Sequence, residues 1–101
     1  MADQVLEIAQ IEVIAGQEAA FEAAVAKAAP QFEAHPGCHH LMLYRSHELP
    51  SRYRLVVEWD SVAAHMDFRE TPAFLEWRRL AGPFFASPPQ VEHVLRVLKA
   101  F

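Results

Sequence analysis

The chain has 101 residues, of which 52% are hydrophobic, and its formal net charge is −4. This combination excludes intrinsic disorder, and a single cysteine excludes a disulfide-stabilised scaffold. No apolar run reaches the ~20 residues of a membrane-spanning helix, and an acidic chain lacks the basic stripe of nucleic-acid-binding proteins. We therefore expect a single domain over residues 1–101 with neither membrane nor nucleic acid as a partner. The start of the chain lacks the basic and apolar segments of a secretory signal, which favours a cytoplasmic protein.

The first third of the chain predicts a strand followed by a helix. Val5–Ile14 is rich in β-branched residues that alternate loosely, and Gly16 follows it as a turn residue. Glu18–Ala29 is rich in alanine and carries an apolar stripe at helical spacing. Pro30 is expected to kink or end this helix, because proline lacks an N–H and clashes with the preceding turn.

The middle of the chain predicts two strands joined by a short connector. Pro36-Gly37 is a turn signal, and the strand Cys38–His47 follows it. The next strand, Arg52–Trp59, separates its apolar and polar residues cleanly by parity. Such a separation indicates one fully covered face and one more polar face.

Two short helices come next, each with a recognisable start. Ser61 is a plausible N-cap for a helix over Val62–Arg69. Thr71 is the N-cap of a second helix over Ala73–Leu80, with Pro72 in the first turn, where its missing N–H does no harm.

A final strand over Val91–Leu98 completes the order β-α-β-β-α-β. This order is the ferredoxin-like α+β arrangement, with a four-stranded antiparallel sheet and helices on one face. The other face needs cover, and the large apolar content favours a homodimer through sheet-to-sheet packing. The more polar parity, with Arg52, Arg54 and Glu58, is the predicted interface.

The segment Trp59–Trp77 resembles the antibiotic biosynthesis monooxygenase (ABM) domain family. It has a strand that ends in Trp, an Asp-Ser helix start, an Ala-His pair and the step Thr71-Pro72-Ala73-Phe74. Gly16-Gln17, Pro36-Gly37-Cys38 and Val91-Glu92-His93 agree with the family pattern as well. The resemblance implies a dimeric α+β barrel with a small-molecule cavity between the sheet and the helices of each protomer.

Members of this family differ in chemistry. Some are oxygenases in which a substrate hydroxyl is deprotonated and the resulting carbanion itself reduces O₂. Others degrade haem with an Asn, a Trp and a His. Aligned through the Thr-Pro step, the Trp position is Phe68 and the His position is Arg78, and the chain contains no Asn. The resemblance therefore argues against haem degradation, and we expect no cofactor.

His65 and Arg78 are the candidate catalytic residues. A histidine, with a pKa near 6.5, suits a general base for a phenolic proton, and the alternative role of His65 is to brace the end of the Trp59 strand. Arg78 can stabilise a phenolate or enolate, and its alternative role is an ordinary surface ion pair with a neighbouring acid.

Aromatic side chains are candidate walls for a flat substrate, with plain core packing as the alternative. Tyr44 shares its strand parity with His40 and Met42, and the sequence leaves open whether this parity, like His93, faces the cavity or a partner. The candidate substrate-binding residues are Trp59, Trp77, Tyr44, Tyr53, Phe68 and Phe74.

The six histidines show no metal-ligand spacing, and the adjacent His39 and His40 point to opposite faces of a strand, so we expect no metal site. Two functions remain open. One is a cofactor-free oxygenase of a small aromatic quinol or polyketide, and the other is a non-catalytic dimeric module that binds a small aromatic ligand. An open pocket of roughly a few hundred Å³ with converging polar groups would favour the enzyme.

Overall fold

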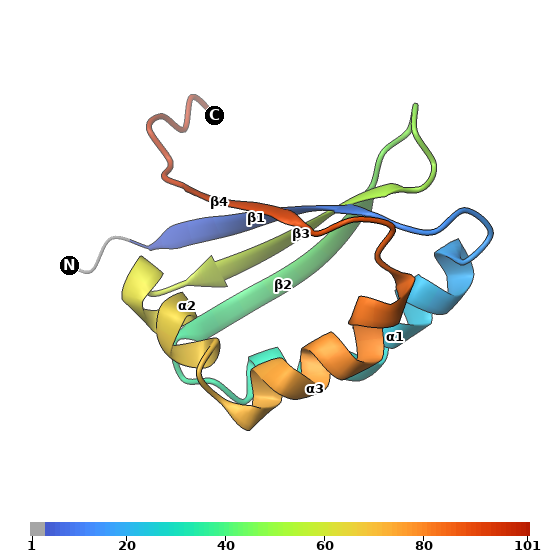
Figure 1. Cartoon of the computed structure of the whole chain (residues 1–101). Coiled ribbons are helices and arrows are strands. Elements are labelled where there is room, and N and C mark those ends of the chain that lie inside the picture. Colours follow the sequence, from blue (N-terminus) through green and yellow to red (C-terminus); the bar gives the residue numbers. More distant parts are fainter. Residues whose placement is uncertain (1–3) are drawn as a thin grey trace.

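The computed structural model describes residues 4–101. Four strands and three α-helices follow one another in the predicted ferredoxin-like order, with α2 and α3 together forming the second helical segment (Figure 1). The elements are β1 (Val5–Glu12), α1 (Glu18–Glu33), β2 (Cys38–Arg45), β3 (Arg52–Trp59), α2 (Val62–Phe68), α3 (Pro72–Ala81), the 3₁₀ turn η1 (Gly82–Phe84) and β4 (Gln90–Val94).

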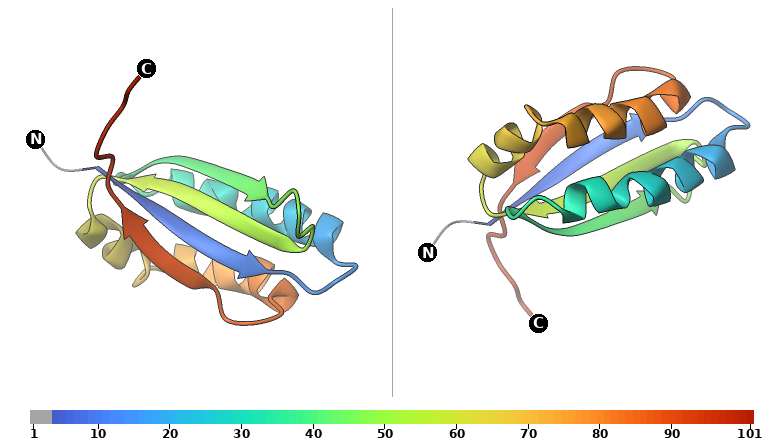
Figure 2. Two further views of the ribbon diagram at one scale, coloured as in Figure 1. Left: turned by 90° about the horizontal axis from the view of Figure 1, so that it is seen from above. Right: turned by 90° about the horizontal axis from the view of Figure 1, so that it is seen from below.

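The strands form one antiparallel sheet in the order β2-β3-β1-β4. β1 therefore lies in the interior of the sheet, with β3 on one side and β4 on the other. All helices cover the same face, and the opposite face is bare of helices (Figure 2). This is the predicted ferredoxin-like α+β fold, and it puts the residues of β1 at the centre of the helix–sheet interface.

The register decides which side chains meet the helices. Tyr53, Leu55, Val57 and Trp59 of β3 are buried on the helical face, which we call the inner face. Leu41 and Leu43 of β2 pair with inner-face residues. His40, Met42 and Tyr44 pair instead with Glu58, Val56 and Arg54 on the outer face. Arg52, Arg54 and Glu58 thus lie on the uncovered face, as the parity of β3 predicted.

An aromatic cluster fills much of the space between α1, α3 and β3. The ring of Phe32 lies 4.7 Å from that of Phe68 and 5.3 Å from that of Trp77, centre to centre. Farther along α1, Phe21 packs on Tyr53 at 4.9 Å. Each of these five side chains is less than a tenth exposed.

The first helix was predicted to stop at Ala29, because Pro30 was expected to kink or end it. The predicted end was wrong, because α1 continues through Pro30 to Glu33. The cost of proline is the lost bond to the carbonyl four residues earlier, and Ala26 is exposed, so water can satisfy that oxygen. The extra turn buries Phe32, whose transfer from water offsets the remaining cost.

Three strands end earlier than predicted, because each loses its neighbour. β1 ends at Glu12, the partner of Arg52, where β3 begins. β2 ends at Arg45, and the N–H of Ser46 then donates to the carbonyl of Arg52. β4 ends at Val94, which pairs with Leu6 near the start of β1, so residues 95–98 lie beyond the ladder. The other predicted boundaries agree within about a residue. No helix within residues 4–101 is long and apolar enough to cross a membrane.

Candidate functional site

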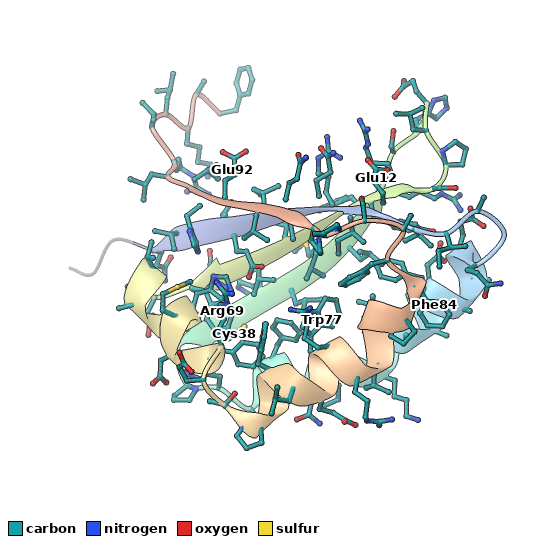
Figure 3. The ribbon with its side chains drawn as sticks, viewed as in Figure 1. Glu12, Cys38, Arg69, Trp77, Phe84 and Glu92 are labelled. Atoms are coloured by element: carbon teal, nitrogen blue, oxygen red, sulfur yellow. The ribbon has the colours of Figure 1, made fainter. Side chains whose placement is uncertain are left out.

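A cavity of about 490 Å³ lies between the sheet and the helices, on the side of β1 and β4. Its floor comes from the strands, its walls carry aromatic rings, and its rim carries two arginines. Trp77 of α3 points up toward the sheet, and Arg69 reaches into the same space from the end of α2 (Figure 3). The lining residues are Glu7, Ala9, Ile11, Leu55, His65, Arg69, Phe74, Trp77, Arg78, Phe85, Ser87, Pro88, Pro89 and Val91.

Helix capping fixes the direction of these side chains. The Oγ of Ser61 accepts a hydrogen bond from the N–H of Ala64 at 3.1 Å, which starts α2 one turn before His65. His65 and Arg69 are four residues apart and therefore lie on one face. Thr71 caps α3 in the same way, as its sequence predicted, and Phe74, Trp77 and Arg78 follow at helical spacing.

A buried polar network borders the cavity. The indole N–H of Trp59 donates to Oε1 of Glu7 at 3.0 Å, and Nε2 of His65 lies 3.3 Å from the same oxygen. The other ring nitrogen of His65, Nδ1, is 2.8 Å from Nε2 of His93 on β4. The ring of His65 also stacks on Trp59, with centres 5.0 Å apart and planes at 15°. The oxygen Oε2 of Glu7 has no hydrogen-bond partner among residues 4–101.

Burial moves the pKa values of this pair in opposite directions. Desolvation raises the pKa of Glu7 to about 7, although the hydrogen bond from Trp59 and the charge of Arg69 act against it. The pKa of His65 is lowered to about 4, chiefly by desolvation, and the electrostatic influence of His93 and Arg69 acts in the same direction. At neutral pH His65 is therefore uncharged, while Glu7 keeps its proton to a much higher pH than a free carboxyl group does.

The two cavity arginines share one aromatic neighbour. The guanidinium carbon of Arg69 lies 5.7 Å from the centre of the Phe74 ring, and that of Arg78 lies 5.8 Å from it. Within residues 4–101 neither guanidinium has a carboxylate within 4.0 Å. Both residues are more than a third exposed, so they lie where the cavity opens to solvent.

This arrangement offers three chemical capabilities. A carboxylate that titrates near neutrality can accept a proton from a weakly acidic hydroxyl. Two cations can stabilise negative charge, and the rings of Trp77, Phe74 and Phe85 can hold a flat apolar body. No three side chains of His, Cys, Asp or Glu in the described part of the chain are grouped to hold a metal ion.

The structure brings together four of the eight predicted site residues at the cavity: His65, Arg78, Trp77 and Phe74. Trp59 and Phe68 are fully buried behind them, with ring centres 5.3 Å apart. They support the wall without lining it.

Tyr53 and Tyr44 do not line the cavity, which corrects the predicted position of both. Tyr53 is buried under α1, and its hydroxyl donates to a carboxylate oxygen of Glu22 at 2.5 Å. Tyr44 is on the outer face, because it pairs with Arg54, and it is 53% exposed. His93, whose orientation the sequence left open, faces inward and meets His65.

Sequence reasoning missed Glu7, Arg69 and Phe85. The sequence pattern could have identified Glu7, since it shares the strand parity of Val5, Ala9 and Ile11. A carboxylate on an otherwise apolar strand face is costly to bury, which indicates a functional role. Arg69 was four residues after His65, the spacing of one helix face. Phe85 lies in an irregular segment, and no sequence pattern pointed to it.

Comparisons with known proteins show which family and fold the chain shares. The family model described as "Antibiotic biosynthesis monooxygenase" matches residues 4–80. The uncharacterized protein YczJ of Bacillus subtilis (strain 168) is 33% identical over 90 residues, which are 88% of this chain and 95% of the relative. A solved structure from Bordetella bronchiseptica, named "Putative antibiotic biosynthesis monooxygenase", is 52% identical with a TM-score of 0.93, covering 95% of this chain and 99% of its own. A structure of the same printed description from Caulobacter crescentus CB15 has a TM-score of 0.83 at 23% identity, covers 96% of this chain and 92% of its own, and shows the shared fold.

Proposed function

The chain belongs to the antibiotic biosynthesis monooxygenase family, and on that premise we propose that it oxygenates a small aromatic quinol or polyketide-type substrate without a cofactor. The observation that carries this proposal is the position of Glu7. Glu7 is 6% exposed and lines a cavity with aromatic walls. Its Oε1 accepts a hydrogen bond from Trp59 and lies 3.3 Å from Nε2 of His65. A carboxylate buried beside a cavity with aromatic walls is costly to folding, which a role in proton transfer explains.

The proposed reaction begins when Glu7 takes the proton of a substrate hydroxyl. The resulting anion is electron-rich at the ring carbon that carries hydrogen, and an arginine at the rim stabilises its charge. This carbon transfers electrons to O₂ and forms a C–O bond, and Glu7 returns its proton to give a hydroperoxide. Loss of water then breaks the O–O bond and leaves a carbonyl. One oxygen atom ends in the product and the other in water, and the substrate supplies all the electrons.

In this proposal Glu7 replaces His65 as the base. A histidine whose pKa lies near 4 is a weak proton acceptor, whereas a carboxyl group whose pKa lies near 7 has the strength that neutral pH requires. His65 is then a positioning residue. Its Nε2 approaches Oε1 of Glu7 and its Nδ1 approaches His93, so Oε2 is left to face the substrate.

The alternative function is a non-catalytic module that binds a small aromatic ligand. A fully packed helix–sheet interface would have favoured it. The cavity of about 490 Å³, with a carboxylate, a histidine and two arginines converging on it, supports the enzyme instead.

Oxygen uptake with a panel of anthrones and naphthoquinols tests the proposal. We expect Glu7→Gln to lower the rate by at least about 100-fold, the usual contribution of a general base. Glu12→Gln is the matched control, because Glu12 is on the same strand and points away from the helices (Figure 3). Wild-type protein that consumes no oxygen with any member of the panel, or a fully active Glu7→Gln variant, would reject the proposal.

The pH dependence of kcat/KM separates the two candidate bases. With Glu7 as the base, kcat/KM rises about tenfold per pH unit and levels off above pH ~7. With His65 as the base, kcat/KM would already be level above pH ~4.

We also propose that the protein is a homodimer through the outer face of the sheet. Met42 and Tyr44 are half exposed there, and Leu6, Ile8 and Val56 are only partly buried. A second copy would cover this face, which no helix covers (Figure 2). Sedimentation velocity at micromolar concentration should give a dimer for the wild type and a monomer for Met42→Glu. A monomeric wild type would reject this model.

A further inference from the structure

Two arginines at one cavity present more positive charge than the proposed chemistry requires. Proton removal by Glu7 creates a single negative charge on the substrate, and one neighbouring cation is enough to stabilise it. Arg69 and Arg78 both line the cavity, and both approach the same ring of Phe74. The second guanidinium is therefore available for a further negative charge.

Both cavity arginines lack an ion-pair partner in the described part of the protein. Neither arginine is within 4.0 Å of a carboxylate of residues 4–101. Arg79, the next residue after Arg78, shows the contrast. Its guanidinium makes two hydrogen bonds to Glu76, at 2.6 and 2.7 Å, and it does not line the cavity. One arginine of α3 is thus neutralised on the surface, while its neighbour presents its charge to the cavity.

The surroundings of the two cavity arginines suit a bound anion. The ring of Phe74, on α3, has its centre 5.7 and 5.8 Å from the two guanidinium carbons, so both charges lie beside the same wall of the cavity. The adjacent walls are Trp77, Phe85 and the prolines 88 and 89, which offer an apolar surface beside the two charges. The planar fork of an arginine matches the two oxygens of a carboxylate.

We propose that Arg69 and Arg78 form an anion subsite and that the ligand of this cavity is a planar aromatic carboxylate. The inference rests on the proposed function in taking the cavity as the substrate site. The aromatic body of the ligand lies against Trp77 and Phe85, and its hydroxyl faces Glu7. Its permanent negative charge lies between the two guanidiniums at the rim. The substrate class is therefore narrowed from any quinol to an aromatic hydroxy acid.

Calorimetric titration with 2-naphthoate and 2-naphthamide tests the anion subsite. The two probes have nearly the same shape and differ in charge, and neither is oxidised during the measurement. We expect the wild type to bind 2-naphthoate at least about tenfold more tightly than 2-naphthamide. Arg69→Gln and Arg78→Gln should each weaken 2-naphthoate by about tenfold and leave 2-naphthamide unchanged.

Arg79→Gln is the matched control, because it removes the same charge from the same helix outside the cavity. It should change the affinity of neither probe. Equal binding of the two probes by the wild type, failure of both probes to bind, or an Arg79→Gln effect as large as that of the cavity variants would overturn the subsite.

These outcomes are separable from those of the proposed function. Arginine-dependent binding of 2-naphthoate by a protein that oxygenates no quinol would reject the monooxygenase and retain the anion subsite. Oxygenation of neutral quinols, together with equal affinity for the two naphthalene probes, would retain the monooxygenase and reject the anion subsite.

Discussion

The two halves of the helix–sheet interface contain similar residue types and have opposite packing. Beneath α1, Phe21 and Phe32 meet Tyr53 and Trp59 of β3, and each of these side chains is at most 3% exposed. Beneath α2 and α3, the strands leave a cavity of about 490 Å³. We call these regions the filled half and the hollow half.

The difference follows from side-chain size and from where the polar groups lie. The floor of the hollow half includes Ala9, a small side chain at the middle of β1, whereas the filled half has large rings on β3. Glu7 and His65 border the hollow half and hold one edge of it polar. Glu7 accepts a hydrogen bond from Trp59, and Nε2 of His65 lies 3.3 Å from the same carboxylate oxygen. The filled half supplies stability, and the hollow half keeps the space and the charges that a ligand needs.

The largest expected effect is the loss of a ring from the filled half. Phe32→Ala should lower the free energy of unfolding by about 3–5 kcal/mol, because it leaves a cavity among packed rings. Phe74→Ala, in the hollow half, should cost only about 1–2 kcal/mol, because Phe74 is partly exposed and already borders open space. Chemical denaturation of both variants checks this, and equal losses would contradict the division into two halves.

The next effect concerns the pH dependence of stability in the hollow half. The pKa of Glu7 is higher in the folded protein, so its contribution falls as pH rises from about 4.5 to about 7. The pKa of His65 is lower in the folded protein, so its contribution rises between about pH 4 and 6.5. The two slopes oppose each other in the wild type. Over most of that range the pair carries one proton in both states, on Glu7 in the folded protein and on His65 in the unfolded chain.

Removal of Glu7 or of His65 should reveal how the remaining residue makes the free energy of unfolding depend on pH. Relative to the wild type, the free energy of unfolding of Glu7→Gln should increase by on the order of 3 kcal/mol as pH rises from 4.5 to 7. That of His65→Gln should decrease by a similar amount, relative to the wild type, as pH rises from 4 to 6.5. Denaturation across this range measures both slopes. Curves that stay parallel to that of the wild type would show that the pair does not exchange a proton on unfolding.

The smallest expected effect compares one substitution in both halves. Ala28→Leu, on the fully buried face of α1, should destabilise the protein by about 1–3 kcal/mol through overpacking. Ala9→Leu should be tolerated within about 1 kcal/mol, because its added carbons can occupy the cavity. The same variant should weaken 2-naphthoate by tenfold or more. A destabilised Ala9→Leu that still binds the probe would place the ligand elsewhere.

Much of the fold could be predicted from the sequence, because local signals and the global arrangement agree. Alternation, capping by Ser61 and Thr71, and turn residues predicted every strand and helix of the described chain. The errors came from long-range effects. Pro30 remains helical because Phe32 is buried by residues of other elements, and β4 stops where β1 offers no further partner.

Less of the candidate site could be predicted. His65 and Arg78 line the cavity as expected, and their neighbours Glu7 and Arg69 were missed. Tyr44 was wrongly predicted to line the cavity, because the alternation of residues along a strand does not show which face packs against the helices. Only pairing with Arg54 and Leu55 on β3 assigned the faces of β2.

By itself the sequence determined the order of elements, the helix starts and the two faces of each strand, since these depend on neighbours along the chain. The tertiary structure decided which half is hollow and which charges meet in it. Glu7 and Trp59, fifty-two residues apart in the sequence, share a hydrogen bond, and their burial gives the carboxylate its raised pKa. Desolvation depends on every element packed around a group, so no local pattern reveals it.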